Sequence, residues 1–384
     1  MRTAIVHYWL LKRRGGEQVL DAIADLLPQA DLVSHVVDPS LLVGPLSGRT
    51  VRTTFISRLP FARTHYPLYL PLMPLALEML DATPYDLIVS SEAGPAKWVI
   101  PRPDAHHVCY CHSPLRYIWD QKQIYLSRFK GPLRLAAEAY ASRLRASDVV
   151  SSLRVDTFVA NSSFVAQRIW KYYRREARVV HPPVEVDRFT VAPAPDDYYL
   201  LAGENRRYKR AEVAVRTCAE LGRRLVVVGG GDWSALKAVA GPRTEFRGRV
   251  SDDAWRDALA KCRALLFPGV EDFGIVPVEV LASGRPVIAL GRGGVLDVVE
   301  PGETGVVYDD PSVEGMKRAI LAFEAEEGAF RPELCVARAQ RFSPDVFRRQ
   351  FAACLPPGAS DRADAALQGP NGGDSPRSPG MGEA

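Results

Sequence analysis

Short apolar runs alternate with helical patterns through the first half of the chain. The sequence opens with TAIVHYWL, and a Gly-Gly pair then leads into EQVLDAIADLL, whose apolar residues recur with helical spacing. Further strand-like runs follow, each separated from the next by a helical or loop stretch: YDLIVSS, HHVCYCHS, TFVANSS and RVVHPPV. Strands that alternate with helices predict a parallel sheet with crossover helices.

A proline-rich break, TVAPAPDD at 190–197, separates this pattern from a second one of the same kind. The second pattern runs through YYLLAGE, AEVAVRTCAELG, RLVVVGGG, TEFRGRV, DDAWRDALAKC, ALLFPG, RPVIAL and GVVYDD. We therefore predict an α/β protein with two Rossmann-like, doubly wound domains, at 1–189 and 198–340. Ligands of such sheets bind outside the carboxyl ends of the strands, so a site should draw on loops from both domains.

The C-terminal part of the chain divides into two pieces. Residues 341–355 predict a helix that packs back toward the first domain. Residues 356–384 are poor in large apolar side chains and rich in Pro, Gly, Ser and Asp. Such a segment cannot bury enough surface to order itself, which predicts a disordered tail.

The composition fits a cytoplasmic protein. Hydrophobic residues make up 47% of the chain, enough for sizeable cores, yet no apolar run approaches the ~20 residues of a membrane helix. The N-terminal segment lacks the basic–apolar–small order of a signal peptide, so it indicates a strand. The six cysteines are scattered through apolar or helical contexts, which is typical of a reduced compartment.

Positive charge is concentrated in the first half, where residues 1–190 carry 24 Lys/Arg against 17 Asp/Glu. Two segments there, 52–80 and 120–145, interleave basic residues with aromatic and aliphatic ones. This pattern favours a surface that rests on anionic lipid, on the inner face of the cytoplasmic membrane. An ordinary helical cover of the sheet, a dimer contact or a solvated basic face would look the same. A nucleic-acid partner is not expected.

Common nucleotide and metal motifs are missing. The glycines of VVVGGGDW do not match G-x-G-x-x-G, and no G-x-x-x-x-G-K-[ST] or Asp-x-Asp motif occurs. In HHVCYCHS, one face of a strand would carry His107, Cys109 and Cys111. Each step of two residues along a strand is ~6.6 Å, so three such ligands cannot converge on one ion. No metal site is expected.

Two acids stand out in EDFGIVPVE, residues 271–279. Glu271 lies in the loop that ends the strand ALLFPG, and Glu279 is expected in the first turn of a helix that starts near Ile275. Gly274 would let backbone approach a ligand, and the free N–H groups of 273–276, from Phe273 onward, would suit phosphate.

A carboxylate one turn into that helix can accept two hydrogen bonds from a ribose diol, and a loop carboxylate can bind sugar hydroxyls. Binding groups for a ribose, a diphosphate and a sugar would then follow one another along the site, as a nucleotide sugar requires. The alternative is that Glu279 merely complements the helix dipole and that Glu271 is a solvated loop acid.

Longer segments resemble glycosyltransferase family 4, whose members are retaining enzymes of GT-B fold. The run FPGVEDFGIVPVEVLASGRPVIALGRGGVLDVVEPGETGVVYDD resembles its donor-binding signature, with the same spacing between the two glutamates. RRGGEQVL, FVANSSFVAQRI and HPPVEVDRF resemble other motifs of the family, in the same order. YCHSPLRYIWD is similar to a branch that builds bacterial surface polysaccharides and often uses GDP-mannose.

The resemblance implies a role for each matched residue. Glu279 would bind the ribose, Glu271 would face the donor sugar, and His112 would lie across the cleft beside that sugar. Gly15 and Gly16 would bring backbone toward the diphosphate or the sugar. Without the resemblance, His112 reads as a core histidine and the glycines as an ordinary strand–helix turn.

The basic clamp for the diphosphate departs from the family pattern. Many relatives have an Arg five positions before a Lys; here Lys209 matches the Lys, but Glu204 occupies the Arg position. An acid cannot hold phosphate, so Arg206 or Arg207 is the expected substitute. Together with a helix N-terminus, Lys209 would stabilise the charge that develops on the leaving diphosphate, without a metal.

The resemblance implies a retaining hexosyltransferase with no cofactor. GDP-mannose is favoured as the donor, a UDP-sugar is possible, and the acceptor would be polyprenyl-diphosphate-linked or another saccharide. No side chain stands out as a nucleophile, so transfer on the front face of the sugar is favoured. Two alternatives stay open: a nucleotide-sugar epimerase of the same fold, and a non-catalytic sugar-nucleotide-binding subunit, which Glu204 favours.

Overall fold

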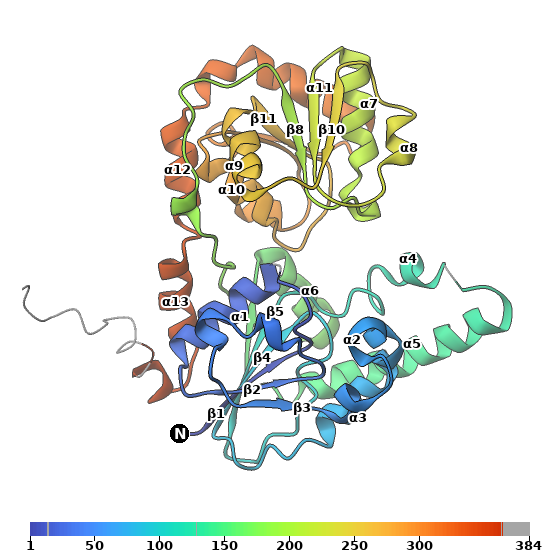
Figure 1. Ribbon diagram of the computed structural model, residues 1–384, viewed down its shortest axis with the longest axis vertical. Helices are drawn as coiled ribbons and strands as arrows, with labels where there is room; N and C mark the ends of the chain where they lie inside the picture. The colour runs from blue at the N-terminus through green and yellow to red at the C-terminus, as the bar shows by residue number, and fades with distance from the viewer. Residues whose placement is uncertain (14, 128, 362, 364–384) are drawn as a thin grey trace, which may run out of the picture.

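The computed structural model describes residues 1–13, 15–127, 129–361 and 363, and shows two domains, each built around one parallel sheet (Figure 1). The first sheet has seven strands in the order β3-β2-β1-β4-β5-β6-β7. The second has six, in the order β10-β9-β8-β11-β12-β13. All pairings between these strands are parallel. The predicted fold class, two doubly wound α/β domains, is confirmed.

The first domain begins with β1 and continues to a short 3-10 helix, η5. Its strands are β1 (Thr3–His7), β2 (Asp31–Ser34), β3 (Val51–Thr53), β4 (Leu87–Glu92), β5 (His106–Cys111), β6 (Thr157–Ala160) and β7 (Ala177–Val179). Its α-helices are α1 (Gly15–Leu26), α2 (Ala62–His65), α3 (Met73–Glu78), α4 (Lys122–Leu126), α5 (Gly131–Ser152) and α6 (Ser163–Tyr173). Its 3-10 helices are η1 (Pro39–Leu41), η2 (Gly44–Leu46), η3 (Phe55–Arg58), η4 (Tyr66–Leu72) and η5 (Val186–Arg188).

In the second domain, strands again alternate with helices along the chain. Its strands are β8 (Tyr199–Ala202), β9 (Leu225–Val228), β10 (Thr244–Gly248), β11 (Ala264–Phe267), β12 (Val287–Leu290) and β13 (Gly305–Tyr308). The helices are α7 (Ala211–Leu221), α8 (Ser234–Lys237), α9 (Asp252–Lys261), α10 (Ile275–Ala282), α11 (Val313–Ala325), α12 (Pro332–Gln340) and α13 (Pro344–Ala352), with η6 (Arg207–Lys209), η7 (Gly294–Asp297) and η8 (Glu327–Ala329).

The central strands are buried on both faces. Every residue of β1 (TAIVH) and of β11 (ALLF) is buried. Helices cover both faces of a parallel sheet, so its inner strands need continuous apolar runs rather than alternation. For this reason the sequence pattern marked these strands clearly.

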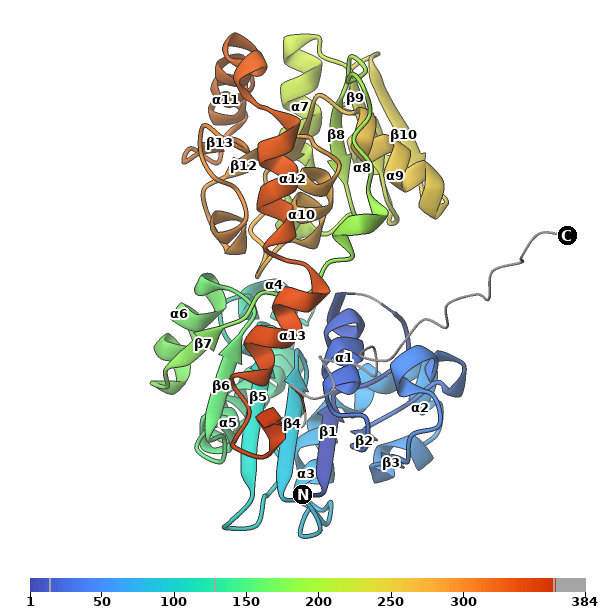
Figure 2. The same cartoon turned by 90° about the vertical axis from the view of Figure 1, so that its left-hand side faces the viewer.

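The last helix crosses back to the first domain. Figure 2 shows α12 against the second domain and α13 beside the first. Phe347 and Phe351 of α13 pack against Tyr110 of β5. The centroid of the Tyr110 ring lies 5.8 Å from that of Phe347 and 6.1 Å from that of Phe351. Both phenylalanines belong to the same buried cluster as the apolar face of α1. Helix α13 therefore completes the core of a domain to which it does not belong in sequence.

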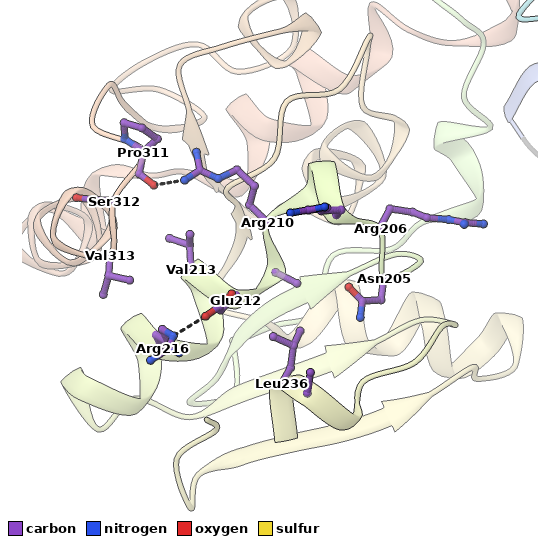
Figure 3. A pocket seen from close by; sticks show the side chains of 13 residues that line it. Asn205, Arg206, Arg210, Glu212, Val213, Arg216, Leu236, Pro311, Ser312 and Val313 are labelled. Carbon is purple, nitrogen blue, oxygen red and sulfur yellow. Dashed lines mark hydrogen bonds and ion pairs between the residues drawn. The ribbon is translucent and has the colours of Figure 1, made fainter. Parts of the chain in front are cut away.

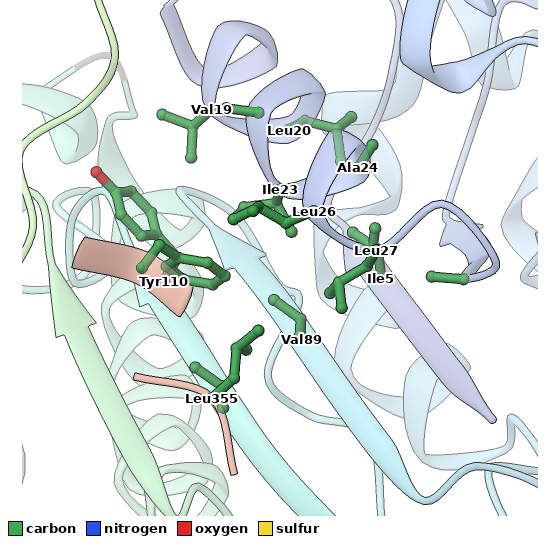
Figure 4. Packing of buried hydrophobic residues seen from close by; sticks show 14 of the residues in the cluster. Ile5, Val19, Leu20, Ile23, Ala24, Leu26, Leu27, Val89, Tyr110 and Leu355 are labelled. Atoms are coloured by element: carbon green, nitrogen blue, oxygen red, sulfur yellow. The ribbon is translucent and has the colours of Figure 1, made fainter. Parts of the chain in front are cut away.

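The same core continues beyond α13. Figure 4 shows Leu355 close to Ile5 and Val89, beneath α1. Ala359 and Ala363 are also buried in this cluster. The packed chain thus extends past residue 356, where the sequence predicted the start of a disordered tail. The rest of that prediction, 364–384, lies outside the described residues. Within the described ranges, no helix is long and apolar enough to span a bilayer.

We expect the α13 contact to carry much of the stability of the first domain. Phe351→Ala should lower the free energy of unfolding by about 3–5 kcal/mol, because it leaves a cavity in a fully buried cluster. Urea denaturation followed by circular dichroism would measure this loss. Arg349→Ala, on the same helix, should have a much smaller effect; equal losses for the two variants would contradict the role of the aromatic contact.

Candidate active site

Two helices, one from each domain, begin at the same place between the sheets. Gly15 is the first residue of α1 and Ile275 the first of α10. These two residues are so close that a Cβ atom added to Gly15 would overlap with Cδ1 of Ile275. A Cβ on Gly16 would lie 2.7 Å from the Tyr8 hydroxyl and 3.8 Å from Cε1 of His112. The Gly-Gly pair therefore lies in the first turn of α1, and a side chain at either position would have to displace the tip of Ile275 or of Tyr8.

His112 follows β5 and is held beside this turn. Its backbone N–H donates to the carbonyl of Glu92 at 2.8 Å, and its carbonyl accepts from the side-chain amide of Asn161 at 3.0 Å. Its Nε2 lies 2.9 Å from the hydroxyl of Ser91, which also lies 3.1 Å from Nδ1 of His7. Ser91 thus bridges two imidazole rings.

This bridge links the tautomers of the two rings. The single O–H of Ser91 can donate to only one of the two imidazoles, so the other ring must donate to the Ser91 oxygen. Burial, with the nearby His7, lowers the pKa of His112 to about 3, so the ring is neutral at physiological pH.

The structure brings Glu271 and Lys209 together. Nζ of Lys209 lies 2.8 Å from Oε1 of Glu271, and each side chain is about four-fifths buried. Gly203, at the end of β8, lies close to the same ammonium group: a Cβ there would be 2.8 Å from it. Glu271 is therefore not a solvated loop acid but one half of an ion pair at the carboxyl ends of β8 and β11.

Glu279 lies in α10, one residue beyond its first turn rather than within it as predicted, because the helix begins at Ile275. Its Oε2 accepts a hydrogen bond from Nε1 of Trp255, at 3.2 Å, a partner on α9 that the sequence did not indicate. Burial raises the pKa of Glu279 to about 7. A carboxyl group with one indole partner and a raised pKa lacks the hydrogen bonds that would stabilise its charge.

The start of α10 presents backbone rather than side chains. Gly274 is the residue before the helix and has φ 99°, a left-handed conformation that favours glycine. The side chain of Phe273 is buried in the core of the second domain, with its ring 5.5 Å from that of Phe342. Phe273 and Gly274 therefore offer a ligand backbone groups rather than side chains, and the N–H groups at the start of α10 have no partner within the helix.

The two candidate clamp arginines lie elsewhere. Arg206 forms an ion pair with Glu204 at 3.0 Å, so the acid that replaces the expected arginine neutralises its nearest substitute. Arg206 and Arg207 line a hollow of about 500 Å³ together with Arg210 and residues of α7, shown in Figure 3. Among the described residues, the ion-pair partner of Glu271 is Lys209 and that of Arg206 is Glu204.

Other cations face the space between the domains. A hollow of about 610 Å³ is lined by Lys12, Arg13 and Arg249, together with Glu204 and Gly230. Lys12 and Arg13 precede the Gly-Gly turn of α1, and Arg249 follows β10. Sequence reasoning missed these residues, although the basic run KRR directly before Gly15 was a usable signal.

The strand with His107 and two cysteines is part of the core. His107, Cys109 and Cys111 are buried, and Nε2 of His107 lies 2.9 Å from the Ser90 hydroxyl. Burial lowers the pKa of His107 to about 4. In the part of the chain that the structure describes, no group of three or more His, Cys, Asp or Glu side chains is placed to hold a metal ion.

Family models match nearly all of both domains. Residues 13–188 match the model described as Glycosyltransferase Family 4, and residues 185–341 match Glycosyl transferases group 1. The chain has the GT-B fold, and each of its two domains matches one of these two glycosyltransferase models. The two matches meet at the link between the sheets, and the predicted fold is confirmed.

Several known proteins are similar to this GT-B chain. D-inositol 3-phosphate glycosyltransferase of Streptomyces avermitilis is 30% identical over 44% of each chain. Human alpha-1,3/1,6-mannosyltransferase ALG2 is 25% identical over 63% of this chain and 65% of its own length. The chain spans about half the length of the first curated relatives it matches.

Solved structures share the fold over nearly the whole chain. HepE of Anabaena in complex with UDP superposes with a TM-score of 0.67 at 18% identity, over 92% of this chain and 99% of that one. Sucrose-phosphate synthase of Thermosynechococcus elongatus gives 0.67 at 18% identity, over 92% and 100%.

The raised pKa of Glu279 predicts a pH dependence of stability. Between pH 4.5 and about 7 the folded protein keeps a proton that the unfolded chain releases, so this group makes folding less favourable as the pH rises. Relative to Glu279→Gln, the wild type should lose free energy of unfolding from pH 5 to pH 8. Urea titrations of both proteins at several pH values would measure the difference, and parallel pH profiles would contradict it.

Proposed function

We propose that the chain is a metal-independent, retaining glycosyltransferase that moves a hexose from a nucleotide diphosphate sugar. The observation that carries this proposal is the meeting of the N-termini of α1 and α10, beside Lys209 and Glu271. Each helix N-terminus has a partial positive charge and free N–H groups. Two of them from two domains, with an ammonium group beside them, suit the diphosphate that leaves when the glycosidic bond breaks.

Glu279, Glu271 and His112 would bind the other parts of the same donor. Glu279 would accept hydrogen bonds from the ribose diol, which would supply the polar partners its carboxylate lacks. Glu271 would face the sugar. His112 would hydrogen-bond to a sugar hydroxyl through Nδ1, since its Nε2 is held by Ser91.

Retention follows if the acceptor hydroxyl attacks the face that the diphosphate leaves, passing its proton to the departing phosphate. This route needs no protein nucleophile and no metal. The N–H groups and Lys209 would stabilise the departing charge throughout. Glu271 would hold the sugar, while His112, neutral at physiological pH, would orient it without adding positive charge near an oxocarbenium-like centre.

We favour GDP-mannose as the donor and keep UDP-sugars as the second candidate. The named mannosyltransferase among the relatives supports the first, and the HepE complexes with UDP and UDP-glucose support the second. For the acceptor we propose a polyprenyl-diphosphate-linked or other saccharide in the assembly of cell-surface polysaccharide.

A donor panel tests the function. A thermal-shift screen without metal should show stabilisation by either GDP-mannose or UDP-sugars, at about 2.7 kcal/mol for a ligand at 100 times its Kd. Glu279→Ala should weaken donor binding by about 10- to 100-fold through the lost ribose contacts. Lys209→Ala should lower kcat by about 100-fold or more. Lys261→Ala, at an exposed ion pair, should leave both unchanged.

Other outcomes would assign the alternatives. Donor turnover that does not depend on an acceptor would indicate an epimerase. Tight donor binding with no turnover, with any saccharide acceptor offered, would indicate a non-catalytic subunit. The absence of any shift with every nucleotide would contradict the nucleotide-sugar site itself.

We also propose that the first domain rests on the inner face of the cytoplasmic membrane. Large apolar side chains are exposed along η4, α3 and the turn before α2, including Phe61 at 77%, Leu68 at 72% and Met79 at 68%. The first turns of α5, which project away from the sheet in Figure 1, expose Leu133 and Leu135. Arg and Lys side chains flank both segments, as an anionic lipid surface would require.

Vesicle binding tests this surface. The wild type should sediment with vesicles that contain anionic lipid, and less so at high salt. The double variant Phe61→Ser, Leu68→Ser should bind several-fold more weakly, whereas Leu321→Ser, at an exposed leucine of the second domain, should bind like the wild type. If both variants bound vesicles equally well, the exposed side chains around Phe61 and Leu68 would not be the membrane-binding surface.

A further inference from the structure

Asp272 follows Glu271 in the chain but contacts the opposite domain. Its Oδ1 accepts a hydrogen bond from Nη1 of Arg168 on α6, at 2.6 Å, and its Oδ2 accepts one from Arg116. Only 11% of the Asp272 side chain and 7% of the Arg168 side chain are exposed. This acid therefore pairs with two arginines of the first domain in a site with little access to water.

Both arginines are tied to the segment that carries His112. Arg168 also donates to Oδ1 of Asp120 at 2.5 Å and to the hydroxyl of Ser113 at 3.0 Å. Ser113, Arg116 and Asp120 all belong to YCHSPLRYIWD, the segment that contains His112. Ser113, Arg116 and Asp120 of this segment thus belong to one polar network with Arg168 and Asp272.

The N-terminus of α6 adds backbone links. The Ser162 hydroxyl donates to the carbonyl of Asp272 at 2.5 Å, and the N–H of Ser163 donates to Oδ2 of Asp297 at 2.6 Å. The neighbouring Asn161 is the residue that holds the carbonyl of His112. Three consecutive residues thus connect the histidine of one domain to two acids of the other.

The loop around Glu271 is held from its far side as well. The N–H of Gly294, at the start of η7, donates to the carbonyl of Glu271 at 2.9 Å, and η7 ends at Asp297. A Cβ on Gly294 would lie 2.5 Å from Cα of Phe273, so the loop and η7 pack backbone to backbone. The loop contacts the start of α6 through Asp272, and η7 contacts it through Asp297.

We propose that Asp272, Arg116 and Arg168 form an interdomain latch that sets the separation of His112 and Glu271 in the closed enzyme. They would be positioning residues, since none of them lies at the donor contacts described above. Removing one partner would leave buried charges unpaired, so the network favours a fully closed or a fully open cleft. The role in catalysis rests on the proposed transferase function, whereas the latch itself does not.

The variant Asp272→Asn tests the latch, because it keeps the shape of the side chain but removes the charge between two guanidinium groups. We expect kcat to fall by at least about tenfold, with less than about a threefold change in donor Kd, because Glu279, Lys209 and the α10 N-terminus remain in place. Asp272→Glu, which restores the charge, should recover part of kcat. Asp257→Asn, at an exposed pair on α9, is the matched control.

Two readouts do not depend on activity. Small-angle X-ray scattering should show a larger radius of gyration for Asp272→Asn than for the control. Hydrogen exchange of the peptide 158–169 should become at least about tenfold faster, because α6 loses its contact with the other domain. Arg116→Gln removes only one of the two arginines that pair with Asp272, and it should shift both readouts in the same direction. This second variant keeps the test decisive if Asp272→Asn fails to fold.

The outcomes separate the latch from the proposed function. Unchanged scattering and exchange in both variants would overturn the latch. The latch would also be overturned if Asp272→Asn lost donor affinity and kcat equally while its scattering stayed unchanged. Asp272 would then act on the donor itself. If the wild type transfers no sugar but the variants open, the latch stands and the transferase proposal fails.

Discussion

Both sheets are parallel, and this constraint decides where every functional group can lie. Parallel strands deliver their carboxyl ends to one edge of a sheet, and the helices that follow begin there, with their positive ends toward that edge. When two such edges face each other, helix N-termini from both domains converge without any special sequence. The contact between Gly15 and Ile275 is one place where they meet, and any side chain at Gly15 would displace the tip of the Ile275 side chain.

This arrangement explains how the site can accept an acid at position 204. In a clamp built from side chains, replacing an arginine by Glu204 and pairing it with Arg206 would remove much of the charge that holds a diphosphate. Backbone N–H groups at two helix starts do not depend on that position. Lys12 and Arg249 bring further positive charge from both domains to the same space, whereas Arg13 is paired with Asp21. The positive electrostatic potential at the site therefore comes from backbone N–H groups and from basic side chains of both domains.

Sequence patterns predicted the features that depend on neighbours along the chain. The buried runs of β1 and β11, the start of α10 at Ile275 and the placement of Glu271 beyond a strand all follow from local spacing. Contacts across the fold left no such mark: Arg116 and Asp272 are 156 positions apart, and Trp255 meets Glu279 only because α9 packs on α10. The start of the predicted tail was placed too early because composition counts large apolar residues, whereas Ala359 and Ala363 pack through small ones.

The division of the site between two domains also determines how a ligand can act on the protein. A ligand shifts a conformational equilibrium only by the difference between its affinities for the two states. In an open cleft a diphosphate would meet one helix N-terminus, while in the closed cleft it would meet both and would lie near His112. An anion of that shape therefore favours closure, and the ion pairs around Asp272 add to it without touching the ligand. Release then requires that neither contribution alone holds the domains together.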